Sequence, residues 1–247
     1  MNVNKIALLR NARGIGIPSV MDAAATCVEA GAHGITVHPR PDGRHIRWSD
    51  VEELVRWCPV EFNIEGYPTP EFLRRVLEHH PTQCTLVPDA PEQLTSDHGW
   101  VLVDSGGPTT DFTRLRTIVP DLQREGIRVS LFIDPVPDQI SRVSEVRADR
   151  IELYTEPYAR TFGSDSGETV LRDFRAAAAH ATGLGLGVNA GHDLNLENLP
   201  RFLGIPSILE VSIGHALVCD ALRVGLHRAV RDYLEVISRA AADAHSA

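Results

Sequence analysis

The most constraining feature of the sequence is a regular alternation of short β-rich runs with longer helical patterns along the whole chain. Such an alternation is typical of βα units built around a parallel sheet. Eight runs have the composition of strands, and they span residues 3–9, 34–38, 61–65, 84–88, 128–134, 150–154, 185–189 and 209–214. Helical patterns occupy residues 19–30, 49–57, 69–79, 111–125, 137–145, 168–184, 196–202 and 216–242.

The number of repeats favours a closed barrel over an open sheet. Eight βα units predict the α/β class and a TIM (β/α)8 barrel, and a length of 247 residues fits one such barrel. Because no linker interrupts the alternation, we predict a single domain over residues 1–247. An open, doubly wound sheet would have similar hydrophobic strands and is the alternative. The glycine-rich run 183–187 is not a dinucleotide fingerprint, because it precedes a strand instead of opening a helix.

Composition excludes several kinds of partner. The net charge of -9 argues against nucleic acid or an anionic membrane. No run approaches the ~20 apolar residues of a membrane span, and the first residues do not resemble a signal peptide, so we expect a cytoplasmic protein. Cys27, Cys58, Cys84 and Cys219 stand singly in apolar stretches. We interpret them as small core residues, and we expect no metal site.

Polar residues end nearly every predicted strand, at the positions where barrel enzymes build their active sites. Lys5, which is the only lysine, and the carboxylates Glu65 and Glu152 lie within strand patterns, as do Asn2 and Asn4. We expect these side chains to project into the barrel, where an unpaired charge is costly to bury. They would therefore form either a structural ion pair that fills the barrel or part of a catalytic set.

Three histidines differ from the others because each follows a β-rich run. His38, His192 and His215 are followed by loop residues or by the start of a helix. Imidazole titrates near neutrality, so it can both accept and donate protons during a reaction with several steps. Three imidazoles at one barrel mouth favour acid/base catalysis.

The sequence also contains candidate binding sites for phosphate. Gly191, and Gly214 with His215, follow the last two strands, where barrels commonly bind phosphate at a helix N-terminus. Arg13, Arg40 and His45 follow the first two strands and could hold a second anion, although an ordinary solvated face would look the same. Two anion sites imply two phosphorylated substrates. The long loop 88–107, which contains Thr95, is expected to be a functional cover.

Short motifs throughout the chain resemble one enzyme family. They are NVNKIALLRNARG (2–14), GITVHPR (34–40), RHI (44–46), NIE (63–65), LVP (86–88), VSLFID (129–134), IE (151–152), VNAGH (188–192) and SIGHA (212–216). Together and in this order they resemble the pyridoxine 5'-phosphate synthase family of vitamin B6 biosynthesis. The resemblance implies condensation of 1-deoxy-D-xylulose 5-phosphate with 3-amino-2-oxopropyl phosphate to pyridoxine 5'-phosphate, phosphate and water, without a metal or an organic cofactor.

The resemblance also implies roles for single residues. His38 and Glu65 would be general bases, His192 a proton donor, and Glu152 a stabiliser of developing positive charge. The amino-ketone phosphate would contact Asn2, Asp193, Gly214 and His215, and the sugar phosphate would contact Asn4, Lys5, Arg13, Arg40, His45 and Thr95. Asn4-Lys5 replaces the Asp-His that is common in the family. Asp193 stands where some members have glycine, so we expect only the backbone N–H of Asp193 to be a contact. A homo-oligomer, an octamer, is implied as well.

Two other functions are compatible with this composition. One is a different phosphate-binding barrel, such as an aldolase or isomerase, although a Schiff-base aldolase would need a lysine on a later strand and none exists. The other is a non-catalytic binding barrel, which would tolerate loss of His38, Glu65 or His192, yet all three are present. An apolar stripe near the C-terminus, formed by Leu222, Leu226, Val230 and Leu234, fits either the core or a subunit interface.

Overall fold

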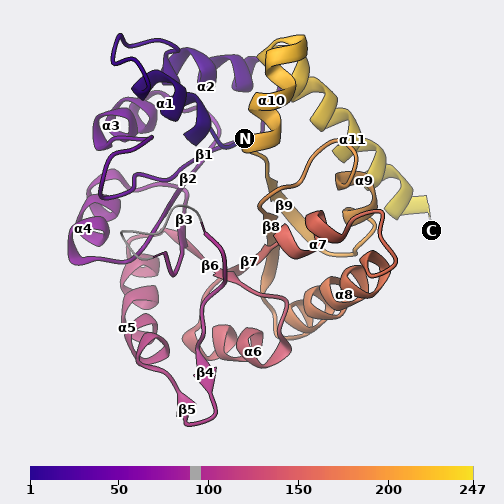
Figure 1. Cartoon of the computed structure of the whole chain (residues 1–247). Coiled ribbons are helices and arrows are strands. Elements are labelled where there is room, and N and C mark those ends of the chain that lie inside the picture. Colours follow the sequence, from indigo (N-terminus) through magenta and orange to yellow (C-terminus); the bar gives the residue numbers. More distant parts are fainter. Residues whose placement is uncertain (90–95, 247) are drawn as a thin grey trace.

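The computed structural model describes residues 1–89 and 96–246, and it shows a ring of helices around a parallel sheet (Figure 1). The seven strands of this sheet follow the order β1-β2-β3-β6-β7-β8-β9, and each pair of neighbours is parallel. The strands are β1 (Gly34–Val37), β2 (Glu61–Gly66), β3 (Gln83–Leu86), β6 (Arg128–Ile133), β7 (Arg150–Tyr154), β8 (Gly187–Gly191) and β9 (Ile208–Ser212). The seven later strand predictions are confirmed to within a few residues. A short hairpin, β4 (Val103–Asp104) with β5 (Gly107–Pro108), lies outside this sheet.

The first predicted strand, residues 3–9, is wrong, because these residues begin the helix α1 (Asn4–Asn11). Its first turn is set at Val3, whose carbonyl accepts from the N–H groups of Ile6 (3.1 Å) and Ala7 (3.3 Å). A short apolar run fits a strand or a buried helix face equally well, and here Ile6 and Ala7 are buried as a helix face. Asn4 and Lys5 therefore belong to a helical turn and not to a strand.

Residues 1–3 take the place of the missing eighth strand and close the barrel. Asn2 forms a parallel bridge with Thr36 of β1, and its N–H donates to the carbonyl of Ile213, just after β9, at 2.9 Å. On the β1 side, Thr36 donates to the Met1 carbonyl at 2.9 Å and accepts from Val3 at 3.2 Å. The single-domain barrel is thus a closed ring in which one position is filled by only three residues.

Helices cover the outside of the sheet. They are α1, α2 (Val20–Glu29), α3 (Trp48–Trp57), α4 (Pro70–His79), α5 (Thr110–Arg124), α6 (Pro137–Val146), α7 (Glu156–Thr161), α8 (Gly167–Gly183), α9 (Leu199–Phe202), α10 (His215–Val224) and α11 (Leu226–Ser246). The prediction missed α7 and treated α10 and α11 as one helix. The long C-terminal helix is interrupted at Gly225, whose φ of 84° is a conformation that glycine adopts readily.

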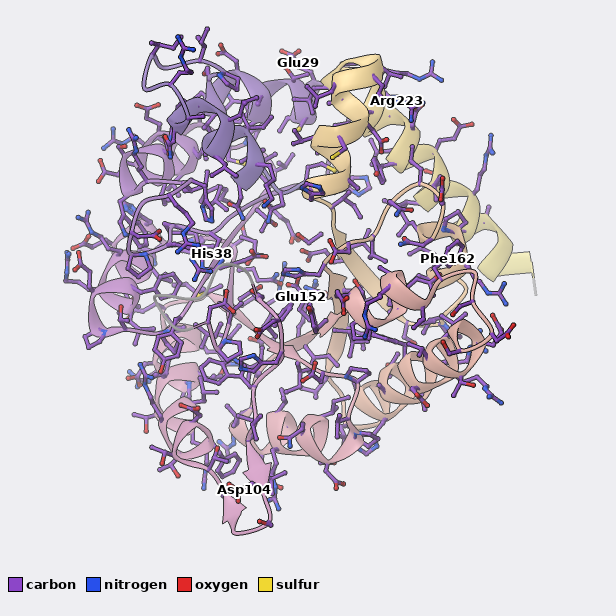
Figure 2. The ribbon with its side chains drawn as sticks, in the orientation of Figure 1. Glu29, His38, Asp104, Glu152, Phe162 and Arg223 are labelled. Atoms are coloured by element: carbon purple, nitrogen blue, oxygen red, sulfur yellow. The ribbon has the colours of Figure 1, made fainter. Side chains whose placement is uncertain are left out.

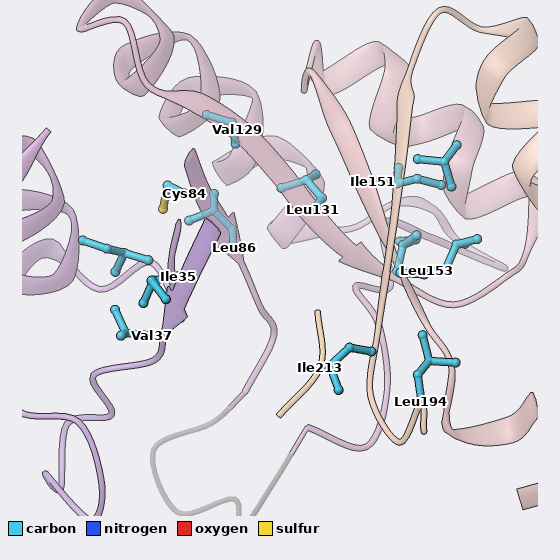
Figure 3. Packing of buried hydrophobic residues seen from close by; sticks show 14 of the residues in the cluster. Ile35, Val37, Cys84, Leu86, Val129, Leu131, Ile151, Leu153, Leu194 and Ile213 are labelled. Carbon is cyan, nitrogen blue, oxygen red and sulfur yellow. The ribbon is translucent and has the colours of Figure 1, made fainter. Parts of the chain in front are cut away.

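The apolar core lies between the strands and the helices. Figure 3 shows Val129 and Leu131 of β6 beside Ile151 and Leu153 of β7, and all four side chains are fully buried. Burial of such side chains is the main stabilising term for the fold, at about 25 cal/mol per Å² of apolar surface. The C-terminal stripe is divided, because Val230 is buried in this core whereas 79% of Leu222 is exposed.

The strand residues that alternate with this apolar set are polar. Asn63, Thr85, Ser130 and Asn189 are buried, and the Thr85 hydroxyl donates to Asn63 Oδ1 at 3.1 Å. In the register of β2 with β3, the polar Asn63 is paired with the polar Gln83, and the apolar Ile64 is paired with Cys84. Polar residues of the two strands therefore lie on one face of the sheet and apolar residues on the other. The barrel interior therefore continues as a polar column up to the strand ends.

Candidate active site

A cavity of about 760 Å³ opens at the carboxyl ends of the strands. Its lining comes from almost every strand end, and Figure 2 places His38 and Glu152 inside the ring of helices. The predicted residues that line it are Asn2, Asn4, Lys5, His38, Arg40, His45, Glu65, Glu152, His192, Asp193, Gly214 and His215. Arg13 is exposed and does not line the cavity, and Thr95 lies outside the described residues.

Two carboxylates line this cavity from β2 and β7, which are separated in the sheet by β3 and β6. Glu65 lies on β2 in register with Thr85, and Glu152 lies on β7 between Phe132 and Asn189. Burial raises the pKa of Glu65 to about 8, with added repulsion from Asp89 and Glu210, while the α-amino group of Met1 opposes the shift.

Burial also raises the pKa of Glu152 well above its ordinary value, and the negative charge of Glu65 is the next cause. Glu65 therefore holds its proton at neutral pH, and repulsion between the two groups disfavours the ionisation of both at once. In the described part of the chain, Lys5 forms no salt bridge with Glu65 or Glu152. The predicted ion pair of Lys5 with these two carboxylates is thus not formed, whereas Arg150 of β7 and Glu210 of β9 are paired at 3.1 Å.

His38 and His45 form a pair of neutral imidazoles on the β1 side. The backbone N–H of His38 donates to Asn4 Oδ1 at 2.8 Å, and the two rings meet edge to face with centroids 6.0 Å apart. Burial lowers the pKa of His38 well below its ordinary value, and His45 and Arg40 add to the shift. Burial, then Arg40 and Lys5, lower the pKa of His45 to about 4. Both rings can accept a proton at neutral pH.

His192 lies on the opposite side, at the end of β8, in an unusual backbone conformation. Its φ of 85° and the φ of 57° at Asp193 are both in the left-handed region, which costs a non-glycine residue about 1 kcal/mol or more. The Thr155 hydroxyl donates to the carbonyls of Gly191 (2.8 Å) and His192, and so holds this turn. Strain of this kind persists only where surrounding contacts maintain it.

The imidazole of His192 is held between aromatic rings. The rings of Phe132 and Tyr154 lie 5.4 Å and 5.3 Å from its centroid. Burial lowers the pKa of His192, and the charges of Asp193 and Asp89 oppose this shift. The contacts with both rings therefore fix the imidazole in position, and burial is the dominant effect on its pKa.

The remaining wall of the cavity is suited to anions. Gly214 and His215 lie where α10 begins, and free N–H groups at a helix N-terminus attract negative charge. A Cβ atom at Gly214 would come within 3.2 Å of the Asn2 side chain, so the close approach of these two residues favours glycine. Lys5, Arg40 and Arg44 supply positive charge on the other side.

Sequence reasoning missed several lining residues. They are Leu8, Arg44, Val87, Asp89, Ser96, Asp97, Phe132, Tyr154, Glu156, Leu194 and Ser212. Asp89 is the most significant of them, because it is a buried carboxylate paired with Arg40 at 3.0 Å. Asp89 directly follows the motif LVP at the end of a predicted strand, and this position was the signal in the sequence that could have identified it as a site residue.

Three further observations concern possible metal ligands, the cysteines and membrane spans. Over residues 1–89 and 96–246, no group of three His, Cys, Asp or Glu side chains is arranged to hold a metal ion. Cys27 and Cys84 are buried as predicted, whereas Cys219 is exposed on α10, against the prediction. None of the helices in the described part of the chain is long and apolar enough to cross a membrane.

The barrel and its cavity define a class of protein: an α/β-barrel enzyme that moves protons on small anionic substrates. Within that class, the chain belongs to the PdxJ family. The family model described as "Pyridoxal phosphate biosynthesis protein PdxJ" matches residues 1–239.

Comparison with individual proteins agrees with this assignment. The chain is 49% identical to a pyridoxine 5'-phosphate synthase of Porphyromonas gingivalis over 96% of this chain and 98% of the relative. It is 50% identical to one of Parabacteroides distasonis, over 94% and 95% of the two chains.

Among solved structures, tryptophan synthase from M. tuberculosis is similar, with a TM-score of 0.61 and 11% identity over 96% of this chain and 90% of that one. Thiamine phosphate pyrophosphorylase from Pyrococcus furiosus has a TM-score of 0.58 and 11% identity, over 91% of each chain. At these identities the likeness shows the barrel fold alone.

Proposed function

We propose that the chain condenses 1-deoxy-D-xylulose 5-phosphate with 3-amino-2-oxopropyl phosphate to form pyridoxine 5'-phosphate, phosphate and water. The observation that carries this proposal is the meeting of His38, Glu65, Glu152 and His192 in one cavity, which Lys5, Arg40 and Arg44 also line. Imine formation, loss of phosphate and water, and ring closure all require proton transfers at positioned atoms. Membership of a family whose relatives have the name of this synthase supports the same reaction.

The electrostatics of the cavity support a division of roles. His38 is neutral at neutral pH and serves as a general base. Glu65 holds its proton in the free enzyme, because its pKa is about 8, and becomes a base when a cationic group of the substrate reaches it. The family resemblance assigns the role of proton donor to His192 and the stabilisation of developing positive charge to Glu152, and because burial lowers the pKa of His192, this imidazole has to take up a proton before it donates one.

The binding roles divide the cavity between two phosphates. Asn2, Gly214, His215 and the backbone N–H of Asp193 bind the amino-ketone phosphate, on the side where α10 begins. Asn4, Lys5, Arg40 and His45 bind the sugar phosphate, on the side with the cationic side chains. Contacts from Arg13 and Thr95 remain predictions, because Arg13 does not line the cavity and Thr95 is outside the described residues.

The proposal is tested by mixing the purified chain with both phosphorylated substrates and measuring pyridoxine phosphate and released phosphate together. The expected result is equal formation of the two products, which depends on both substrates. Omission of either substrate is the control, and the variant His192→Asn should form neither product at the wild-type rate. A chain that binds both substrates without forming product would instead be a non-catalytic binding barrel.

We further propose that the chain acts in the cytoplasm as a homo-oligomer, an octamer. Exposed apolar side chains on neighbouring elements support self-association, notably Leu8 and Leu9 of α1 with Leu222 and Val224 of α10. Light scattering during size-exclusion chromatography gives the mass directly. A monomer at micromolar concentration would contradict this part of the proposal.

A further inference from the structure

Asp89 is a buried acid in the cavity to which the roles above assign no task. It follows β3 at the barrel mouth, and only 3% of the residue is exposed. Its Oδ2 accepts a hydrogen bond from Arg40 Nη1 at 3.0 Å and another from the Ser96 hydroxyl at 2.7 Å. In the described structure, its other oxygen, Oδ1, is buried without a hydrogen-bond partner.

The Arg40–Asp89 pair is almost completely removed from solvent. The exposed fractions of the two side chains are 4% and 2%. Breaking a buried pair by removing one partner is strongly unfavourable, because the remaining charge is left uncompensated. This hydrogen bond therefore anchors Nη1 of the planar guanidinium of Arg40, and the rigid group presents its N–H donors in a fixed fork.

The negative charge of Asp89 also acts on the acid/base groups nearby. After burial, Asp89 is the largest cause of the raised pKa of Glu65, followed by Glu210, and the α-amino group of Met1 acts in the opposite sense. Glu152 interacts with Glu65 as well. On the far side, burial lowers the pKa of His192, and the charges of Asp193, Asp89 and Glu156 oppose this shift while that of Lys5 adds to it.

We propose that Asp89 is a positioning residue, which holds the guanidinium of Arg40 at the cavity mouth in the orientation that receives the phosphate of the sugar substrate. This inference rests on the proposed function. It adds Asp89 as a residue that acts through Arg40 and does not itself contact the substrate. Ser96 takes part in the same arrangement, because its hydroxyl fixes the carboxylate from the other side. As a second consequence, the charge of Asp89 favours the protonated form of Glu65.

The test compares Asp89→Asn, which keeps the shape and removes the charge, with Asp121→Asn as a matched control. Asp121 is an exposed helix residue paired only locally with Arg124, so its variant changes the net charge equally and should behave as wild type. In Asp89→Asn we expect KM for the sugar phosphate to rise about tenfold, as for a lost charged contact. KM for the amino-ketone phosphate should change by less than about twofold, because Arg40 lies on the other side of the cavity.

Two further readouts separate positioning from a merely structural role. The acidic limb of the pH profile of kcat/KM should move to lower pH by about one unit in Asp89→Asn, because a negative charge near Glu65 has been removed. In an Arg40→Gln background, Asp89→Asn should change KM by less than about twofold, because its effect passes through Arg40. If Asp89→Asn does not fold, Ser96→Ala replaces it, with an expected rise of about threefold in the same KM.

An unchanged KM and pH profile in the folded Asp89→Asn variant would overturn the proposal, as would an unchanged KM in Ser96→Ala when that variant is used. An equal rise of both KM values with no shift of the pH profile would also overturn it, because the role would then be structural. If the wild type forms no product, the proposed function fails. In that case, calorimetric binding of the sugar phosphate replaces KM, and an equal Kd for wild type and Asp89→Asn then overturns the inference separately.

Discussion

Replacement of Gly191 by alanine should damage the active site through a single contact. A Cβ atom at this position would lie 2.2 Å from Glu152 Oε1, and 3.4 Å from Cβ of Ser212. Ordinary contact requires a separation that is larger by about 1 Å, so the buried carboxylate has to move by that distance. Overpacking of this kind costs about 1–3 kcal/mol of the free energy of unfolding. For a chain of this length, the melting temperature should fall by roughly 2–10 °C.

The effect on catalysis should be larger than the effect on stability. A displacement of about 1 Å in a catalytic group can reduce the rate by about 100-fold. We therefore expect Gly191→Ala to lower kcat by about that factor in an assay of pyridoxine phosphate formation, while the variant remains folded by circular dichroism. The melting temperature is measured on the same samples.

Two other variants make the reasoning testable. Gly183→Ala is the matched control, because a Cβ atom there meets nothing within 4 Å, and it should retain wild-type activity. Glu152→Asp shortens the carboxylate side chain, so combining it with Gly191→Ala should restore part of the lost melting temperature. Wild-type kcat and melting temperature in Gly191→Ala would refute the argument. A double variant no more stable than Gly191→Ala would show that Glu152 is not the group that clashes.

Three other predictions concern the acid/base groups and their supports. Glu65→Gln should abolish turnover while the far-ultraviolet circular dichroism stays unchanged, and a near-normal rate would remove Glu65 from the mechanism. Because the folded-state pKa of Glu65, about 8, is above its unfolded value, wild-type stability should decline as pH rises from about 4.5 to about 8. Chemical denaturation should show Glu65→Gln gaining stability relative to wild type across this window, and a constant difference would contradict the pKa. Thr155→Val removes the hydroxyl that donates to Gly191 and His192, so the free energy of unfolding should fall by about 1–3 kcal/mol. Its kcat should fall as well, and unchanged values of both would show that the strained turn needs no such support.

Most of the barrel could be predicted from the sequence, because its strands are covered by helices and are therefore strongly apolar. The error at residues 3–9 has a local cause, since IALL is compatible with a strand and with a helix face. Only the hydrogen bonds of Met1 and Val3 with Thr36, and of Asn2 with Ile213, show that residues 1–3 alone are extended, and these bonds depend on residues far away in the chain.

The candidate site was predicted unevenly for a related reason. His38, Glu65, Glu152 and His192 could be found because they lie within or directly after predicted strands, and strand ends converge in a barrel. Asp89 could not be distinguished from a loop acid, because its importance comes from burial and from Arg40, which lies almost fifty positions away. The left-handed backbone of His192 and Asp193 could not be predicted either, because neither residue is a glycine that would mark such a conformation in the sequence.

The closure of the ring by residues 1–3 has a consequence for how the molecule is made. Met1 and Val3 are hydrogen-bonded to Thr36 of β1, and Asn2 is hydrogen-bonded to Ile213, so the closing contacts join parts of the chain that leave the ribosome at very different times. Long-range contacts of this kind raise the contact order and slow folding. The pocket wall formed by Asn2 and Gly214 therefore cannot exist on a nascent chain that lacks β9, and an unfinished polypeptide has no complete substrate pocket.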